Sequence, residues 1–187
     1  QGIGDEIMFS SVIPDLHKAC SQLIVKADKR LIPILRRSFP KDIAFCESNT
    51  PVSEGDYDAH IAMGSLPLHF RPNIESFKTA AQGYLSADGK RAAVLRDRLL
   101  SDGSEILIGL SWHSTSKIRV AQKRTIPLGQ LARAFQGENV KFVSLQYGDM
   151  DDEINRVKRD YGIDVVQVGQ IDNFHDIDGL AALITAC

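Results

Sequence analysis

Short apolar runs alternate with amphipathic helical patterns along almost the whole chain, and this alternation is the feature that most limits its possible folds. The runs are rich in Ile, Val and Phe, as buried strands are. The stretches between them carry apolar residues at steps of three and four, which is typical of helices that bury one face. Strands separated by helices predict βαβ units, so we expect an α/β fold with parallel sheets.

The alternation occurs twice. In the first half the predicted strands are 23–27, 43–46 and 59–63, and the predicted helices are 5–20, 29–38 and 88–100. In the second half the predicted strands are 106–112, 140–145 and 165–168, and the predicted helices are 127–135, 150–161 and 177–187. Residues 64–86, which include two prolines, are expected to form a loop with short helical turns.

A short polar segment, Ser101-Asp-Gly-Ser104, is the best linker candidate between the two halves. We therefore predict two Rossmann-like lobes, residues 1–103 and residues 104–187. The first residue is Gln1 rather than Met, no strand precedes the first glycine turn, and no stop signal follows the last helical pattern. From this we expect truncation at both ends and an incomplete second lobe.

Composition excludes several classes of protein. A hydrophobic share of 43% and a charged share of 25% are ordinary for soluble globular proteins and argue against disorder. Because 22 basic and 24 acidic residues nearly cancel, no overall positive field attracts nucleic acid. Three widely spaced cysteines fit neither a disulfide framework nor a zinc site, and no apolar run could span a bilayer. These features predict a cytoplasmic protein without a transmembrane segment.

The first candidate functional residue is Asp5, in the turn Gly2-Ile-Gly-Asp5 that opens the first predicted helix. A carboxylate at a helix N-terminus is favoured in its ionised form, which suits a general base. With equal weight, Asp5 could simply cap the helix. The turn is not the dinucleotide fingerprint, because Ile7 stands where a third glycine would be needed.

The second candidate is the polar, cationic segment after the strand 106–112. It contains Ser114, Lys117 and Arg124 and leads into the next predicted helix, whose free N–H groups would suit a diphosphate. Ligands of open α/β sheets bind at the carboxyl ends of strands, where this segment falls. A solvated surface loop with scattered charges is the alternative interpretation.

Weaker candidates follow the later strands. Gln146, Tyr147 and the acidic run 149–153 follow the strand 140–145, where a base or ribose could be bound, although a plain βα connection is the preferred interpretation. Residues 174–176 occupy the corresponding position after the strand 165–168. No His, Cys or Asp spacing suggests a metal site, so no metal or other cofactor is expected.

Several stretches, in the same order along the chain, resemble the glycosyltransferase family 9 superfamily, known from bacterial heptosyltransferases, and particularly its members fused to tetratricopeptide repeats. The stretches are Gln1-Gly-Ile-Gly-Asp-Glu-Ile-Met-Phe9, Gly64-Ser-Leu-Pro67, Tyr84-Leu-Ser86, Gly109-Leu-Ser-Trp112, Arg124-Thr-Ile-Pro127 and Phe142-Val-Ser-Leu-Gln146. The resemblance implies a GT-B fold of two facing Rossmann-like lobes. It also implies inverting, metal-independent transfer of a sugar from a nucleotide-sugar donor to a glycan, lipid or protein acceptor.

The resemblance also implies roles for individual residues. Asp5 matches the base that deprotonates the acceptor hydroxyl, and Arg124 matches a cationic residue that contacts donor phosphate. Lys117 lies near Arg124, and Ser114 is the nearest match to a hydroxyl residue facing the donor, while His113 departs from the usual type. An Asp-Thr segment with further donor contacts should follow Cys187, so these 187 residues alone are expected to be inactive.

Two other functions stay open. One is a non-catalytic nucleotide-binding or interaction module of a repeat-containing protein, in which the site has decayed. The other is a nicotinamide-dependent oxidoreductase, against which the missing third glycine argues.

Overall fold

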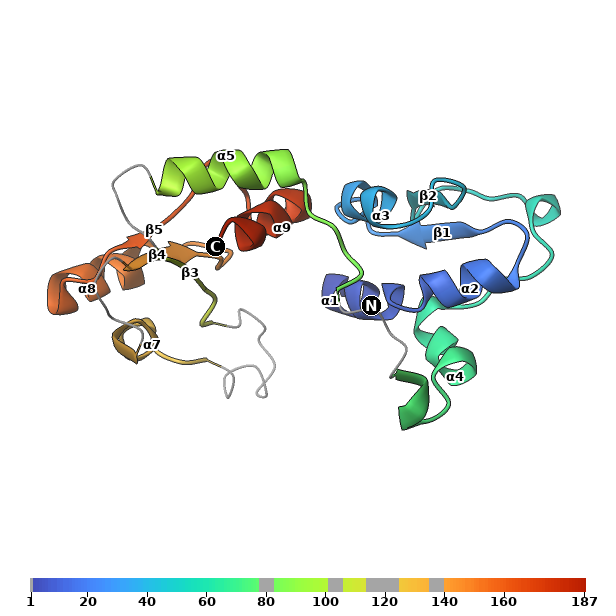
Figure 1. Cartoon of the computed structure of the whole chain (residues 1–187), viewed down its shortest axis with the longest axis horizontal. Helices are drawn as coiled ribbons and strands as arrows, with labels where there is room; N and C mark the ends of the chain where they lie inside the picture. Colours follow the sequence, from blue (N-terminus) through green and yellow to red (C-terminus); the bar gives the residue numbers. More distant parts are fainter. Residues whose placement is uncertain (1, 78–82, 101–105, 114–124, 135–139) are drawn as a thin grey trace. The chain divides into compact units, whose positions relative to one another are not determined.

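The computed structural model describes residues 2–77, 83–100, 106–113, 125–134 and 140–187 (Figure 1). The chain is an α/β protein with two small parallel sheets, which confirms the predicted fold class at this level. It divides into two compact units, one ending at Ser86 and the other beginning at Ala87.

The first unit contains a two-stranded sheet and short helices. Its strands are β1 (Ile24–Ala27) and β2 (Ala44–Glu47), and its helices are α1 (Ile3–Ser10), α2 (Ile13–Ala19), α3 (Ile32–Ser38) and α4 (Leu66–Phe70). Three 3-10 turns, Glu54–Asp56, Met63–Ser65 and Ile74–Phe77, lie in the long connection after β2. The two strands are parallel, with Val25 opposite Phe45, and both of these side chains are buried.

The predicted helix 5–20 is two helices, because Pro14 lies in the first turn of α2. A proline ring clashes with the carbonyl group four residues earlier, and here that residue is Ser10, the last of α1. Around the break, Val12 and Ile13 are buried, whereas the side chain of Met8 is exposed.

The predicted strand 59–63 is wrong. Residues 59–62 form neither helix nor strand, and Met63 begins a 3-10 turn. Only Ile61 in this run strongly favours a strand, and its side chain is exposed, so burial does not stabilise pairing of this run with the sheet.

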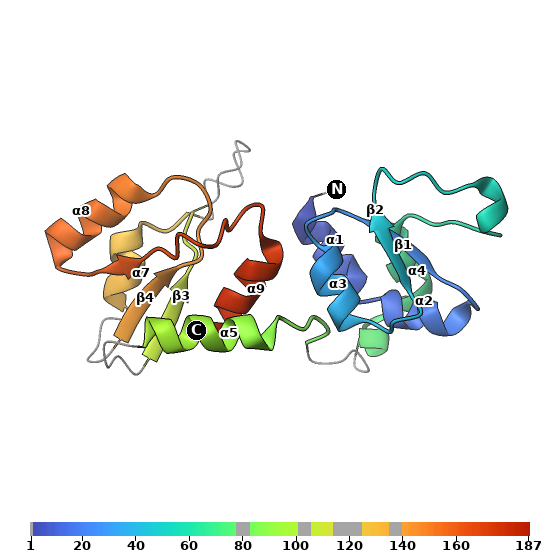
Figure 2. The same ribbon diagram turned by 90° about the horizontal axis from the view of Figure 1, so that it is seen from above.

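The second unit is a three-layer α/β/α structure. Its strands are β3 (Ile106–Leu110), β4 (Val140–Ser144) and β5 (Val165–Val166), and its helices are α5 (Gly89–Leu99), α7 (Leu128–Ala134), α8 (Asp151–Tyr161) and α9 (Ile177–Ala186). The strands are parallel in the order β3-β4-β5. Val143 packs with α5 and α9, while its neighbour Phe142 packs with α7 and α8 on the opposite face. Figure 2 shows β3 and β4 between α9 and the pair α7 and α8.

The division between the units precedes α5 and does not coincide with the predicted linker at 101–104. The helix α5 packs against α9, and the guanidinium group of Arg91 donates two hydrogen bonds to the Asp176 carboxylate, at 3.2 and 2.5 Å. Burial raises the pKa of Asp176. The hydrogen bonds from the Arg91 guanidinium and the Gly179 N–H together lower it by more, so the pKa of Asp176 lies below its ordinary value. These contacts make α5 part of the second unit.

In the described part of the chain, no helix has both the length and the apolar character that crossing a membrane requires.

Candidate functional site

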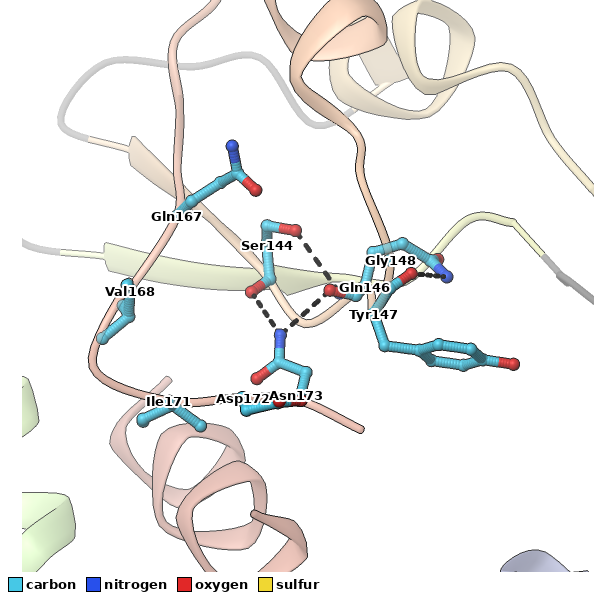
Figure 3. Close-up of a pocket in the computed structure, with 10 residues that line it drawn as sticks. Ser144, Gln146, Tyr147, Gly148, Gln167, Val168, Ile171, Asp172 and Asn173 are labelled. Atoms are coloured by element: carbon cyan, nitrogen blue, oxygen red, sulfur yellow. Dashed lines mark hydrogen bonds between the residues drawn. The ribbon is translucent and has the colours of Figure 1, made fainter. Parts of the chain in front are cut away.

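A pocket of about 180 Å³ opens at the carboxyl ends of β4 and β5 (Figure 3). Its walls are the segments that leave these two strands, and its lining residues are Ser144, Gln146, Tyr147, Gly148, Gln167, Val168, Gly169, Ile171, Asp172 and Asn173. Among the described residues, the lining contains amide and hydroxyl groups and one carboxylate but no Lys or Arg. Such a lining suits a neutral polar ligand better than a phosphate group.

Asn173 holds the two walls together. Its Nδ2 group donates hydrogen bonds to the backbone carbonyl oxygens of Gln146, at 3.0 Å, and Ser144, at 3.4 Å (Figure 3). Its Oδ1 atom is buried and accepts no hydrogen bond from the part of the chain that the structure describes. Turning the amide over would direct Oδ1 at two carbonyl oxygens, so the hydrogen bonds of Nδ2 fix the orientation of the amide.

Gln146 lies at the end of β4, but its side chain reaches to the end of β3. Its Oε1 atom accepts hydrogen bonds from the backbone N–H groups of Trp112, at 3.2 Å, and His113, at 3.0 Å. The hydroxyl group of Ser111 lies 3.4 Å from the same oxygen. The donor contact predicted for Gln146 stays a prediction, and the structure adds that its amide oxygen already has these partners.

Aromatic rings gather beside the pocket. Tyr147 and Phe174 are partly exposed, with ring centroids 5.5 Å apart, and Phe174 also contacts the ring of His175 at 4.8 Å. The carboxylate of Asp172 fixes this arrangement. Its Oδ1 atom accepts from the N–H groups of Phe174 and His175, and its Oδ2 atom lies 2.8 Å from His175 Nδ1. Tyr147, a predicted donor contact, therefore lies within an exposed aromatic cluster at the pocket.

The hydrogen bond from His175 is the largest of the effects that lower the pKa of Asp172 to about 2. We expect His175→Ala to raise the pKa of Asp172 toward its ordinary value of 3.8. Because the folded pKa is depressed, the stabilisation from this carboxylate is present above pH 3.8 and is lost as the pH falls toward 2. Carbon-13 NMR titration of the Asp172 carboxyl group measures the shift, and an unchanged midpoint would contradict it.

In the first unit, Asp5 is exposed in the first turn of α1. Its Oδ2 atom accepts from the Gly2 N–H at 3.3 Å, so the capping interaction considered from the sequence is present. The next residue, Glu6, accepts from the Asp28 N–H at 2.8 Å and thereby fastens α1 to the carboxyl end of β1. The Arg30 guanidinium holds the pKa of Asp28 at about 2. Asp5 is thus an available carboxylate on a firmly held helix turn.

The other predicted donor contacts, Ser114, Lys117 and Arg124, lie outside the described residues. The helix α7, which follows them, is described. Its first N–H group was expected to be free, but it donates a hydrogen bond within the chain. Glu153 accepts from the Leu128 N–H at 3.2 Å through Oε1 and from the Trp112 indole at 2.8 Å through Oε2. The first N–H group of α7 therefore already has an acceptor within the chain.

Glu6, Asp172 and Asn173 belong to these sites but were not singled out from the sequence. Glu6 carried a usable signal, since an acidic residue in the first turn of a helix is favoured there. Asn173 carried none, because it contacts a segment that is distant along the chain. Glu153 belongs to the acidic run 149–153, but its contacts with Trp112 and Leu128 could not be read from the sequence.

Fold and pocket together define an α/β protein of two units, with a polar pocket at the carboxyl ends of parallel strands. Among curated proteins, the chain is similar to Protein FlbA of Caulobacter vibrioides, with 30% identity over 202 residues. The match covers 100% of this chain and 34% of FlbA, so the chain spans about a third of that relative's length. No family model matches the chain, and no solved structure matches it significantly.

Proposed function

We propose that this chain is part of an inverting, metal-independent glycosyltransferase of GT-B architecture, which moves a sugar from a nucleotide-diphosphate donor to an acceptor hydroxyl. The observation that carries the proposal is the pocket at the carboxyl ends of β4 and β5. Ligands of open parallel sheets bind at this edge. The resemblance of the opening turn and of the strand ends to glycosyltransferase family 9 supplies the reaction.

The pocket's chemistry favours the nucleoside part of such a donor. Its described lining is polar, with amide and hydroxyl groups, and has no Lys or Arg. Exposed rings of Tyr147 and Phe174 beside it offer a surface on which a flat base can stack. A nucleobase and its ribose match this combination of aromatic and neutral polar groups.

The diphosphate requires a positive environment that the described pocket does not supply. In the proposal Lys117 and Arg124 provide it, offsetting the charge that grows on the leaving diphosphate. Because Glu153 already accepts from the Leu128 N–H, we do not assign this helix N-terminus to the phosphates.

Transfer then needs one proton acceptor. Asp5 removes the proton of the acceptor hydroxyl as its oxygen bonds to the anomeric carbon, on the face opposite the departing nucleotide. The bond from that carbon to the diphosphate oxygen breaks, which inverts the configuration. Asp5 is exposed and its cap contact with Gly2 is long, at 3.3 Å, so its carboxylate remains able to accept a proton.

The cap contact of Asp5 favours a second candidate, a non-catalytic nucleotide-binding module in which this residue is only structural. Calorimetric titration of the full-length protein with nucleoside diphosphates, run beside a sugar-transfer assay, separates the two. We expect both binding and turnover. Binding without turnover on any acceptor would favour the module, and no binding would contradict both.

A further inference from the structure

We propose that Tyr84 is a positioning residue for the transfer reaction: its hydroxyl group donates to the Ile7 carbonyl oxygen and so fixes the helix turn that carries Asp5. This role rests on the proposed function, in which Asp5 accepts the proton of the acceptor hydroxyl. The contact lies within the first unit. Tyr84 opens the stretch Tyr84-Leu-Ser86, to which the proposed function assigns no role.

The carbonyl oxygen of Ile7 lies in the last turn of α1, where regular helical pairing ends. In a regular α-helix this oxygen would accept from the Ser11 N–H, but that group donates to the Met8 carbonyl oxygen, at 3.4 Å. Two hydroxyl groups donate to the Ile7 oxygen instead, from Ser10 at 2.7 Å and from Tyr84 at 2.6 Å. The Tyr84 hydroxyl thus satisfies an acceptor at the end of α1.

The segment that carries Tyr84 is itself bonded to α3. The Ser86 N–H donates to the Ser38 hydroxyl oxygen at 2.8 Å, and the Ser86 carbonyl oxygen accepts from the Arg37 guanidinium at 3.2 Å. The Ser38 hydroxyl in turn donates to the Ile34 carbonyl oxygen, at 2.6 Å, one turn earlier in α3. Because these bonds lie two residues from Tyr84, its hydroxyl group connects α1 to a segment that α3 already holds.

Two hydrogen bonds therefore hold α1 immediately after Asp5, and they lead to different elements. The Glu6 carboxylate accepts from the Asp28 N–H, at 2.8 Å, at the carboxyl end of β1. The Ile7 carbonyl oxygen accepts from Tyr84, whose segment is bonded to α3. One attachment alone would let the helix turn about it, whereas two restrict both its position and its direction.

A general base needs such a restraint, because its oxygen must meet the acceptor hydroxyl at hydrogen-bond distance. The Asp5 carboxylate is exposed, and its contact with the Gly2 N–H lies within its own turn, so that contact does not place the turn in the unit. A displacement of about 1 Å can cost about 100-fold in rate. Losing the Tyr84 hydroxyl should therefore slow the reaction through Asp5.

The test compares Tyr84→Phe with Tyr57→Phe, the matched control. Tyr57 is exposed in the same unit, and its ring contacts that of His60. The full-length protein hydrolyses UDP-glucose, GDP-mannose or ADP-glucose, with water as the acceptor, and release of the nucleoside diphosphate is measured. We expect Tyr84→Phe to lower kcat about tenfold and to leave the donor KM within about twofold, because the pocket proposed for the nucleoside lies in the second unit.

The control should change neither kcat nor KM. An unchanged kcat in Tyr84→Phe, or a donor KM that rises as much as kcat falls, would overturn the proposal.

Combining Tyr84→Phe with Asp5→Asn shows whether Tyr84 acts through Asp5. If it does, Tyr84→Phe costs about tenfold in the wild-type background but less than about twofold beside Asp5→Asn, because the group that it positions no longer takes a proton. Losses that multiply would mean a role independent of Asp5 and would overturn the proposal.

The same data separate the two levels of the proposal. Near-normal hydrolysis by Asp5→Asn, or no hydrolysis of the three donors by the wild type, would mean that the proposed function fails and the positioning role with it. A slow Asp5→Asn beside an unaffected Tyr84→Phe would remove the positioning role alone.

A further measurement needs no ligand. Hydrogen exchange followed by mass spectrometry should be about two- to tenfold faster in α1 of Tyr84→Phe, as the loss of one hydrogen bond implies, while β1 keeps its protection. Faster exchange in both elements would mean a general loss of stability, and unchanged exchange in α1 would mean that the hydroxyl group holds nothing; either result overturns the proposal.

Discussion

Replacing Asp5 with Asn in the full-length protein should lower the rate of sugar transfer by about 10²- to 10⁴-fold, the usual contribution of a general base. The substitution is informative because it separates chemistry from structure. Asn keeps an oxygen that can accept from the Gly2 N–H, so the contact at the start of α1 is retained. Only the ability to take a proton is lost. Steady-state transfer kinetics measure the effect, and thermal unfolding should show little change.

Glu6→Gln is the matched control. It removes the same charge from the same helix turn, and its amide oxygen can still accept from the Asp28 N–H. We expect its transfer rate to stay within about threefold of the wild type, since the contact that holds α1 is kept and Asp5 is unchanged. Near-normal turnover in Asp5→Asn would remove Asp5 from the catalytic role. A large loss in Glu6→Gln alone would assign the base to Glu6.

The order of strands and helices in the second unit could be predicted from the sequence because it depends on local patterns. In β4, Val140, Phe142 and Val143 are the β-branched and aromatic residues that favour a strand, and two of them are adjacent, as in strands buried on both faces. Phe142 packs with α7 and α8, and Val143 packs with α5 and α9. The type of this element was therefore predictable, whereas the helices that cover each face were not.

The two errors in the first unit have signals that are visible once the physical rule is applied. Residues 5–20 were predicted as one helix, but the clash of the Pro14 ring with the Ser10 carbonyl group ends α1 there. The run 59–63 was predicted as a strand from its apolar residues, although Ala is a poor strand former. Ending the first helix before Pro14, and giving more weight to the low strand propensity of Ala in the run 59–63, would have removed both errors.

The residue at which the second unit begins depends on contacts that no local sequence pattern reveals. The polar segment 101–104 has the composition of a linker, yet the chain divides before α5 because Arg91 binds Asp176, a residue far along the sequence. The contacts of Gln146 at the site likewise depend on a segment that is distant along the chain. Its place after a strand predicts a ligand contact, but the orientation of its side chain toward Trp112 depends on how β3 and β4 pair.

Glu153→Ala should lower the free energy of unfolding of the second unit by about 2 to 4 kcal/mol, because hydrogen bonds to a charged group contribute about 1.5 to 3 kcal/mol each. One side chain here makes two such bonds, with the Trp112 indole and with the Leu128 N–H. Trp112 and Leu128 are 2% and 0% exposed, so water cannot readily replace the lost acceptor. Urea unfolding followed by fluorescence measures the change directly, since Trp112 is the one tryptophan of the sequence.

Asp152→Ala is the control for charge. Asp152 is exposed in the same first turn of α8, so its removal costs only the interaction with the helix dipole, about 0.3 to 1 kcal/mol. Glu153→Gln should fall between the two, because an amide offers one oxygen to two donors. Equal, small losses in Glu153→Ala and Asp152→Ala would show that the bonds of Glu153 contribute nothing beyond charge. A larger loss in Glu153→Ala would establish that this carboxylate joins the end of β3 to the start of α7, on either side of the predicted phosphate-binding residues.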